Sequence, residues 1–136
     1  MPSMASITVK KADGTTDIVF DQISASGGEN SPAFWRQDTG AAAGLPVGLR
    51  PYLRLSSKWN GPKTARQIAF EANFPYAVQD STTTLYSAKD RVVATGVITM
   101  PQGIPSVNLN EAAAQILNLL SSALIKSSVQ VGYAPT

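Results

Sequence analysis

Two alternating segments on either side of one turn constrain the fold more than any other feature. Every second position of residues 50–58 is polar or basic: Arg50, Tyr52, Arg54, Ser56 and Lys58. Leu53 and Leu55 lie between them, so a strand here is basic on one face and apolar on the other. Residues 65–76 alternate in the same way after the turn signal Asn60-Gly61-Pro62. The sequence predicts a long β-hairpin.

All charges from Arg50 to Arg66, in the first arm, the turn and the start of the second arm, have one sign. No acidic residue lies between Asp38 and Glu71, although the whole chain carries 11 Lys and Arg against 9 Asp and Glu. A basic strand face suits a polyanion, and Tyr52 among the cations suits a stacked base, so nucleic acid is the leading partner. An ordinary solvated sheet face explains the same pattern, and a tyrosine that fills a gap in the sheet is the rival interpretation of Tyr52.

Composition limits the other possibilities. A length of 136 residues with 43% hydrophobic content predicts one folded domain, residues 1–136. The chain has no cysteine and no histidine, which removes disulfides, thiol and imidazole chemistry and most transition-metal sites. No stretch is apolar enough to span a bilayer, and residues 1–11 have no apolar core of signal-peptide type. We expect no enzyme, no cofactor, no metal, no small-molecule substrate and no membrane partner.

The N-terminal third predicts further strands. Residues 7–9 and 17–20 are β-prone and flank Asp13-Gly14, so they form a hairpin. A short strand follows at residues 33–36, with Trp35 as a buried anchor, and residues 39–48 read as a flexible connection.

The second half predicts one more strand and a helical region. Pro75 is expected to end the second hairpin arm, and residues 78–89 to form a polar loop before a last strand at 91–100. Residues 109–127 carry apolar side chains at helical spacing, with Asn108 as N-cap. Ser121-Ser122 either bends this helix or splits it, and an extended tail follows from residue 129. The fold class is α+β: an antiparallel meander of about six strands followed by a C-terminal helical region.

One helix covers such a sheet incompletely, which favours a dimer. Three leucines of the apolar stripe are the candidates for the dimer contact: Leu117, Leu120 and Leu124. An ordinary core helix within a monomer is the alternative.

The order of these elements resembles a known family. An N-terminal hairpin, Ala33-Phe34-Trp35, a basic hairpin that ends at Phe74-Pro75, a strand that ends at Thr99-Met100-Pro101 and a C-terminal helix are similar to the coat proteins of single-stranded RNA bacteriophages, the leviviruses. The resemblance covers nearly the whole chain. It implies an intertwined dimer with a continuous ten-stranded sheet. It also implies that these dimers assemble into an icosahedral shell in the bacterial cytoplasm and that the protein is part of the virion.

The resemblance also implies that the inner sheet face of the dimer binds an RNA stem-loop, which represses replicase translation and marks the genome for packaging. Carried over by strand position, the RNA-binding residues are Arg50, Tyr52, Arg54, Ser56, Lys58, Lys63, Gln67, Arg91 and Thr95. Three residues depart from the family pattern, which favours a cation or a hydroxyl at Ala69 and Glu71 and an aromatic residue at Val93. A small dimeric RNA-binding regulator that does not assemble is the alternative function.

Overall fold

The computed structural model describes all residues, Met1–Thr136. They form two compact units, Met1–Thr99 and Met100–Thr136, which we describe in turn. The prediction of one domain stays a prediction.

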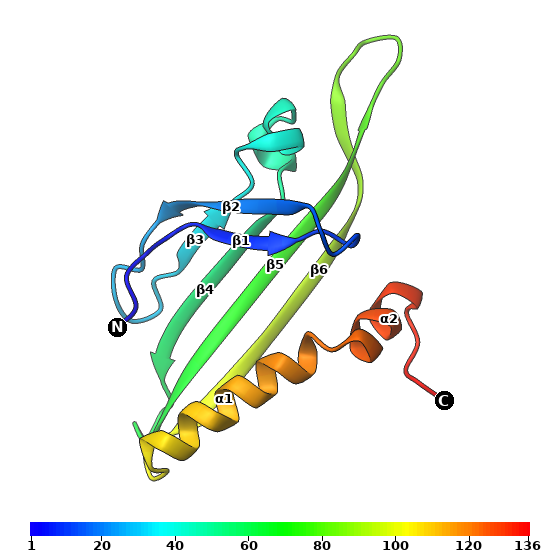
Figure 1. The fold of residues 1–136 in the computed structure, drawn as a ribbon. Coiled ribbons are helices and arrows are strands. Elements are labelled where there is room, and N and C mark those ends of the chain that lie inside the picture. Colours follow the sequence, from blue (N-terminus) through cyan, green and yellow to red (C-terminus); the bar gives the residue numbers. More distant parts are fainter. The chain divides into compact units, whose positions relative to one another are not determined.

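The first unit is built on an antiparallel meander (Figure 1). Its strands are β1 (Ile7–Lys10), β2 (Asp17–Ser24), β3 (Ala33–Arg36), β4 (Tyr52–Trp59), β5 (Ala65–Gln79) and β6 (Tyr86–Pro101). They follow one another in the sheet in chain order, β1-β2-β3-β4-β5-β6. The six-stranded meander, the N-terminal hairpin and the short third strand that the sequence predicts are therefore confirmed.

The core lies on the apolar face of the sheet, beneath the N-terminal hairpin. In Figure 1, β1 and β2 cross in front of β3, β4 and β5. Trp35 is buried and donates a hydrogen bond from Nε1 to the carbonyl oxygen of Ala5 (2.8 Å), and the rings of Phe20 and Phe74 meet edge to face, with centroids 6.0 Å apart. The predicted role of Trp35 as a buried anchor is confirmed.

The pairing of β4 with β5 fixes which side chains share the opposite face. Arg54 stands opposite Glu71, Ser56 opposite Ala69, and Lys58 opposite Gln67. Asn60 closes the turn, because its Oδ1 accepts hydrogen bonds from the amides of Thr64 (2.8 Å) and Ala65 (3.2 Å). The side chains share the face that the alternation of the two segments predicts.

Two boundaries in this unit differ from prediction. Pro75 does not end β5, which continues to Gln79, and β6 already begins at Tyr86. The polar loop is thus shortened to residues 80–85. The reason lies in the pairing: β4 pairs only as far as Asn73, so Pro75 lies beyond the end of β4 and has no bond to that strand to lose. Asp80 closes the short loop, since its amide donates to Leu85 and its carbonyl accepts from Thr84.

The segment predicted as a flexible connection is instead folded. It contains two 3-10 helices, η1 (Gly40–Gly44) and η2 (Val47–Leu49), and Ala42 is buried. Arg50 therefore precedes β4 and does not lie on it.

The second unit consists of two helices, α1 (Ser106–Leu120) and α2 (Ala123–Val131). The break at Ser121-Ser122 confirms the split form of the predicted helix. The predicted N-cap is wrong, because Pro105 occupies that position and Asn108 lies in the first turn. The predicted extended tail is wrong as well: α2 runs to Val131 and ends where Gly132 adopts a left-handed conformation, with φ +81°.

Candidate nucleic-acid interface

We call the side of β4 and β5 away from the core the polar face. It is defined by Tyr52, Arg54, Ser56 and Lys58 of β4 and by Gln67, Ala69, Glu71 and Asn73 of β5. Phe34 of β3 extends it, because Phe34 pairs with Arg54. Alternation along neighbouring antiparallel strands is sufficient to gather these side chains.

Arg54 lies on two aromatic rings in the middle of the polar face. Its guanidinium carbon is 5.0 Å from the centroid of Tyr52 and 5.6 Å from that of Phe34, and the two rings are themselves in contact, 5.4 Å apart. Arg54 Nη1 is 3.8 Å from Glu71 Oε2, a loose ion pair, and the two side chains are 49% and 37% exposed. The two rings hold the guanidinium in place while its N–H groups stay accessible.

Tyr52 connects this pair to a buried amide. Its hydroxyl donates to Glu71 Oε1 (3.2 Å) and accepts from Asn73 Nδ2 (3.4 Å). Asn73 is buried, and its Oδ1 has no hydrogen-bond partner. Tyr52 thus fills part of the sheet face and keeps a half-buried ring. Its stacking on a base stays a prediction.

An open hollow of about 460 Å³ lies on the polar face. It is lined by Asn30, Pro32, Arg54, Ser56, Ala69, Phe70, Glu71, Thr95, Gly96 and Val97. The hollow brings together three of the residues proposed from the sequence to bind RNA, namely Arg54, Ser56 and Thr95. Sequence reasoning missed Asn30 and Pro32, because nothing in the loop before β3 indicates that it returns to the sheet.

Three of the predicted cations have no carboxylate partner: Lys58 on β4, Lys63 in the turn and Arg91 on β6. All three are exposed, and Gln67 stands opposite Lys58. Arg66, in contrast, pairs with Glu29 and lies 4.8 Å from the ring of Trp59. The cations without a carboxylate partner are therefore the two lysines of the hairpin and Arg91 of β6.

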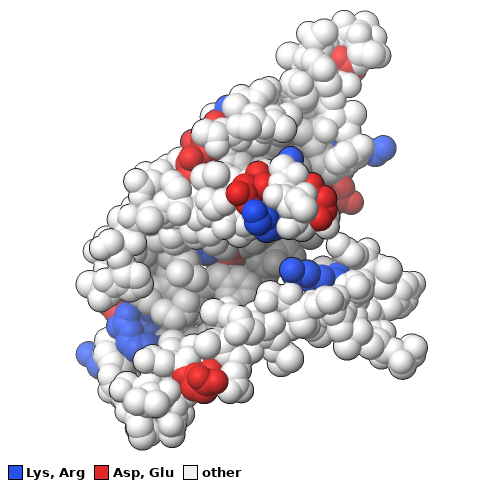
Figure 2. All heavy atoms as spheres, in the orientation of Figure 1, with Lys and Arg blue, Asp and Glu red and all other residues white.

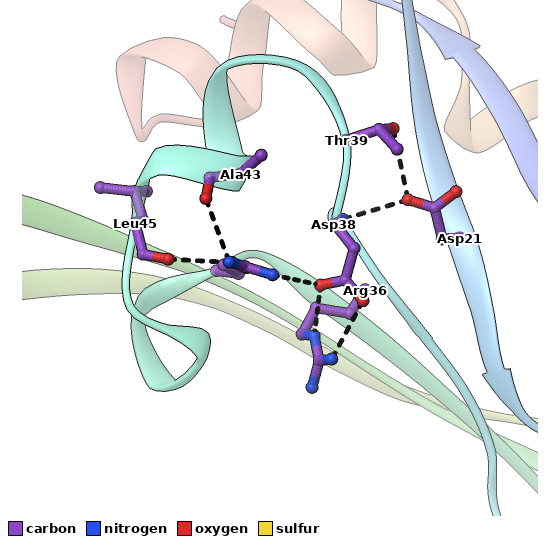
Figure 3. Close-up of polar contacts among 7 residues, drawn as sticks. Asp21, Arg36, Asp38, Thr39, Ala43 and Leu45 are labelled. Carbon is purple, nitrogen blue, oxygen red and sulfur yellow. Dashed lines mark hydrogen bonds and ion pairs between the residues drawn. The ribbon is translucent and has the colours of Figure 1, made fainter.

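Arg50 is engaged elsewhere (Figure 3). Its Nη1 donates to Asp38 Oδ1 (2.8 Å), its Nε to the carbonyl of Leu45 (3.0 Å) and its Nη2 to that of Ala43 (3.1 Å). The side chain is only 16% exposed. Arg50 thus stabilises the 3-10 segment, and its side chain does not line the hollow.

Asp38 is the hub of this network. Arg36 donates to both of its carboxylate oxygens, from Nε to Oδ1 (2.7 Å) and from Nη2 to Oδ2 (3.0 Å). The hydrogen bonds from Arg36, and then the one from Arg50, lower the pKa of Asp38 to about 2 despite its partial burial. Asp21 secures the other side, because its Oδ2 accepts from the Asp38 amide (3.1 Å) and from the Thr39 hydroxyl (3.3 Å).

The side of the molecule that carries β1 and β2 has a different charge pattern. Figure 2 shows acidic and basic side chains close together over this hairpin. Lys10 and Asp17 form an ion pair there (2.5 Å), and Asp13 accepts hydrogen bonds from Thr16, which, together with the Thr15 amide, lower its pKa to about 2. This side therefore lacks an excess of free cations.

The predicted dimer residues carry apolar surface that the single chain leaves exposed. Leu117 and Leu120 lie on α1 and Leu124 on α2, with 52–62% of each residue exposed. Strand β6 is the last strand of the sheet, and its neighbouring residues Val92 and Val93 are exposed as well.

Neither helix is long and apolar enough to cross a bilayer. No group of three or more acidic side chains lies close enough together to hold a metal ion.

Comparison with known proteins gives the fold. No protein-family model matches the sequence, and no curated protein does. Among solved structures, the virus-like particle of Beihai levi-like virus 21 matches with 15% identity over 99% of both chains and a TM-score of 0.78. The virus-like particle of bacteriophage NT-214 has 13% identity over 99% of this chain and 100% of that one, with a TM-score of 0.79.

The capsid protein of bacteriophage GA is similar too, with 12% identity over 96% of this chain and 95% of that one and a TM-score of 0.71. The chain therefore has the fold of the coat proteins of single-stranded RNA bacteriophages. The resemblance expected from the order of the elements is confirmed at the level of fold.

Proposed function

We propose that this chain is a capsid protein that dimerises, assembles into an icosahedral shell around a single-stranded RNA genome and binds an RNA stem-loop on its polar face. One observation carries the proposal: over 99% of its length, the chain has the fold of chains that form virus-like particles. The proposed location of the protein is therefore the virion, and the proposed place of assembly is the cytoplasm of the bacterial host.

The uncovered apolar surface supports dimerisation. A last strand with valines exposed on both faces offers its free backbone edge to a second copy. The joint sheet would have ten strands if β1 of each copy stays outside it, since five strands then remain in each chain. The helical leucines 117, 120 and 124 give the second copy further apolar surface to cover.

The unpaired cations support RNA binding. Lys58, Lys63 and Arg91 lie free, and a dimer would present six such charges. Six phosphate contacts to single-stranded RNA give a slope of log K against log salt of about −4. Tyr52, Ser56, Gln67 and Thr95 supply the stacking and hydrogen-bonding groups that hold unstacked bases of a loop. Such binding at the start of the replicase message would repress its translation.

The salt dependence of RNA binding tests the proposal. We expect Lys58→Ala to make this slope shallower by about 1.4, since it removes two phosphate contacts per dimer. Lys11→Ala is the matched control, because it removes the same charge from the turn of the N-terminal hairpin. Equal effects of the two variants would contradict the placement of RNA on the polar face. Dimers that bind RNA but form no particles would favour the non-assembling regulator.

A further inference from the structure

We infer that the hollow on the polar face is a guanine-selective subsite, in which Glu71 accepts from the base and Arg54 donates to it. The inference rests on the proposed function, because it assumes that RNA lies on this face. Glu71 is notable because a carboxylate repels phosphates, so a surface that only bound the RNA backbone would be better served by a cation at this position.

The pair is open to a ligand. The 3.8 Å between Arg54 Nη1 and Glu71 Oε2 is too long for a hydrogen bond, and Arg54 donates none elsewhere in the chain. Glu71 accepts only the hydroxyl of Tyr52, on Oε1. A guanidinium carries five N–H donors, and a carboxylate has about four acceptor positions. Most hydrogen-bonding positions of these two side chains, which line the hollow, are therefore unoccupied within the chain.

The pair is also held in position. The rings of Tyr52 and Phe34 lie under the guanidinium, and the Tyr52 hydroxyl ties down one oxygen of Glu71. Asn73 supports that hydroxyl from a buried position. Donor and acceptor are thus pre-organised side by side at the wall of a hollow whose volume, about 460 Å³, is within the range of about 300–1,000 Å³ typical of small-ligand sites.

Guanine is the base whose edge matches this arrangement. Its N1–H and N2–H2 groups are adjacent donors that a single carboxylate accepts together, and its O6 acceptor beside them suits an arginine. Adenine and cytosine present a ring nitrogen acceptor where guanine has N1–H. Uracil has one N–H between two carbonyl oxygens, one of which would oppose the carboxylate. Ser56 and Thr95 add hydroxyls, which adapt to either kind of partner.

The test measures the affinity of the dimer for RNA hairpins with one stem and a uridine loop in which a single position carries guanosine, inosine, adenosine or cytidine. We expect the best guanosine loop to bind about tenfold more tightly than the corresponding adenosine loop, a typical discrimination for a bidentate contact. Inosine, which lacks the N2 amine, should fall between them. Lys58→Ala should weaken binding to all loops by a similar factor.

Two variants separate base recognition from charge. Glu71→Gln should abolish most of the guanosine preference, and Arg54→Lys should reduce it while it keeps the positive charge. If Glu71→Gln instead strengthened binding to every loop equally, as the loss of a negative charge near phosphates would, the inference would be overturned. Binding without base preference would overturn this inference alone, whereas the absence of any RNA binding would overturn the proposed RNA-binding function.

Discussion

The sequence and the structure give opposite roles to Arg50, and a pair of substitutions decides between them. As a phosphate ligand at the start of a basic strand, Arg50 would matter for RNA and little for stability. As observed, it makes three hydrogen bonds, to Asp38 and to two carbonyls of the 3-10 segment. We therefore expect Arg50→Ala to destabilise the fold and to leave RNA affinity nearly unchanged.

The magnitude follows from these contacts. A hydrogen bond that involves a charged group contributes about 1.5–3 kcal/mol, but water can reach the exposed residue Ala43, and Asp38 keeps Arg36. The combined loss is therefore about 2–3 kcal/mol. At about 3–4 °C per kcal/mol, Tm should fall by about 6–12 °C. Lysine has no planar fork, so Arg50→Lys should recover at most about 1 kcal/mol although it keeps the charge.

The assay is thermal unfolding of RNA-free protein, followed by circular dichroism at one fixed concentration because association shifts Tm. Fluorescence anisotropy at constant salt gives the affinity of the same samples for RNA. The reasoning would be refuted if Arg50→Ala had a normal Tm and bound RNA clearly more weakly, with Arg50→Lys restoring that binding.

Three further outcomes are expected. Gly96→Ala should lower stability by about 1–2 kcal/mol in urea unfolding, because the new methyl would lie 2.5 Å from the Phe70 ring, whereas Gly44→Ala meets no atom within 4 Å and should be nearly neutral. The stability contributed by the ionised Asp38 should be complete above its ordinary pKa of 3.8 and be lost as the pH falls through about 2. The Tm difference between wild type and Asp38→Asn should therefore shrink between pH 4 and 2. Leu120→Asp should give a folded monomer in sedimentation velocity, since it places a charge in the proposed dimer contact.

The strands were predictable because their signals are local. Alternation at Arg54 and Lys58 gives the face, and Asn60-Gly61 gives the turn, whereas the exact β4–β5 register comes from the structure. The site of the helix irregularity at Ser121-Ser122 is also a local signal, because serine side chains compete for backbone hydrogen bonds, but the choice between a bend and a break comes from the structure.

Other features depend on partners that are distant in sequence. The sequence does not show where β5 ends, because the effect of Pro75 depends on where β4 stops, which no local signal records. The Gly and Ala residues of the 3-10 segment carry little pattern and predict a flexible connection, whereas its order comes from the contacts of Arg50 with Asp38 and with the Leu45 carbonyl. Glu71 was recognised as a departure from the family pattern, yet its position beside Arg54 and Tyr52 required the structure.

The central claim is that this chain encloses RNA in a shell, and negative-stain electron microscopy of the purified recombinant protein tests it most directly, with the 260/280 nm absorbance ratio measured on the same fraction. We predict uniform round particles whose absorbance ratio shows nucleic acid. Small species without nucleic acid, in protein that is folded by circular dichroism, would contradict the claim.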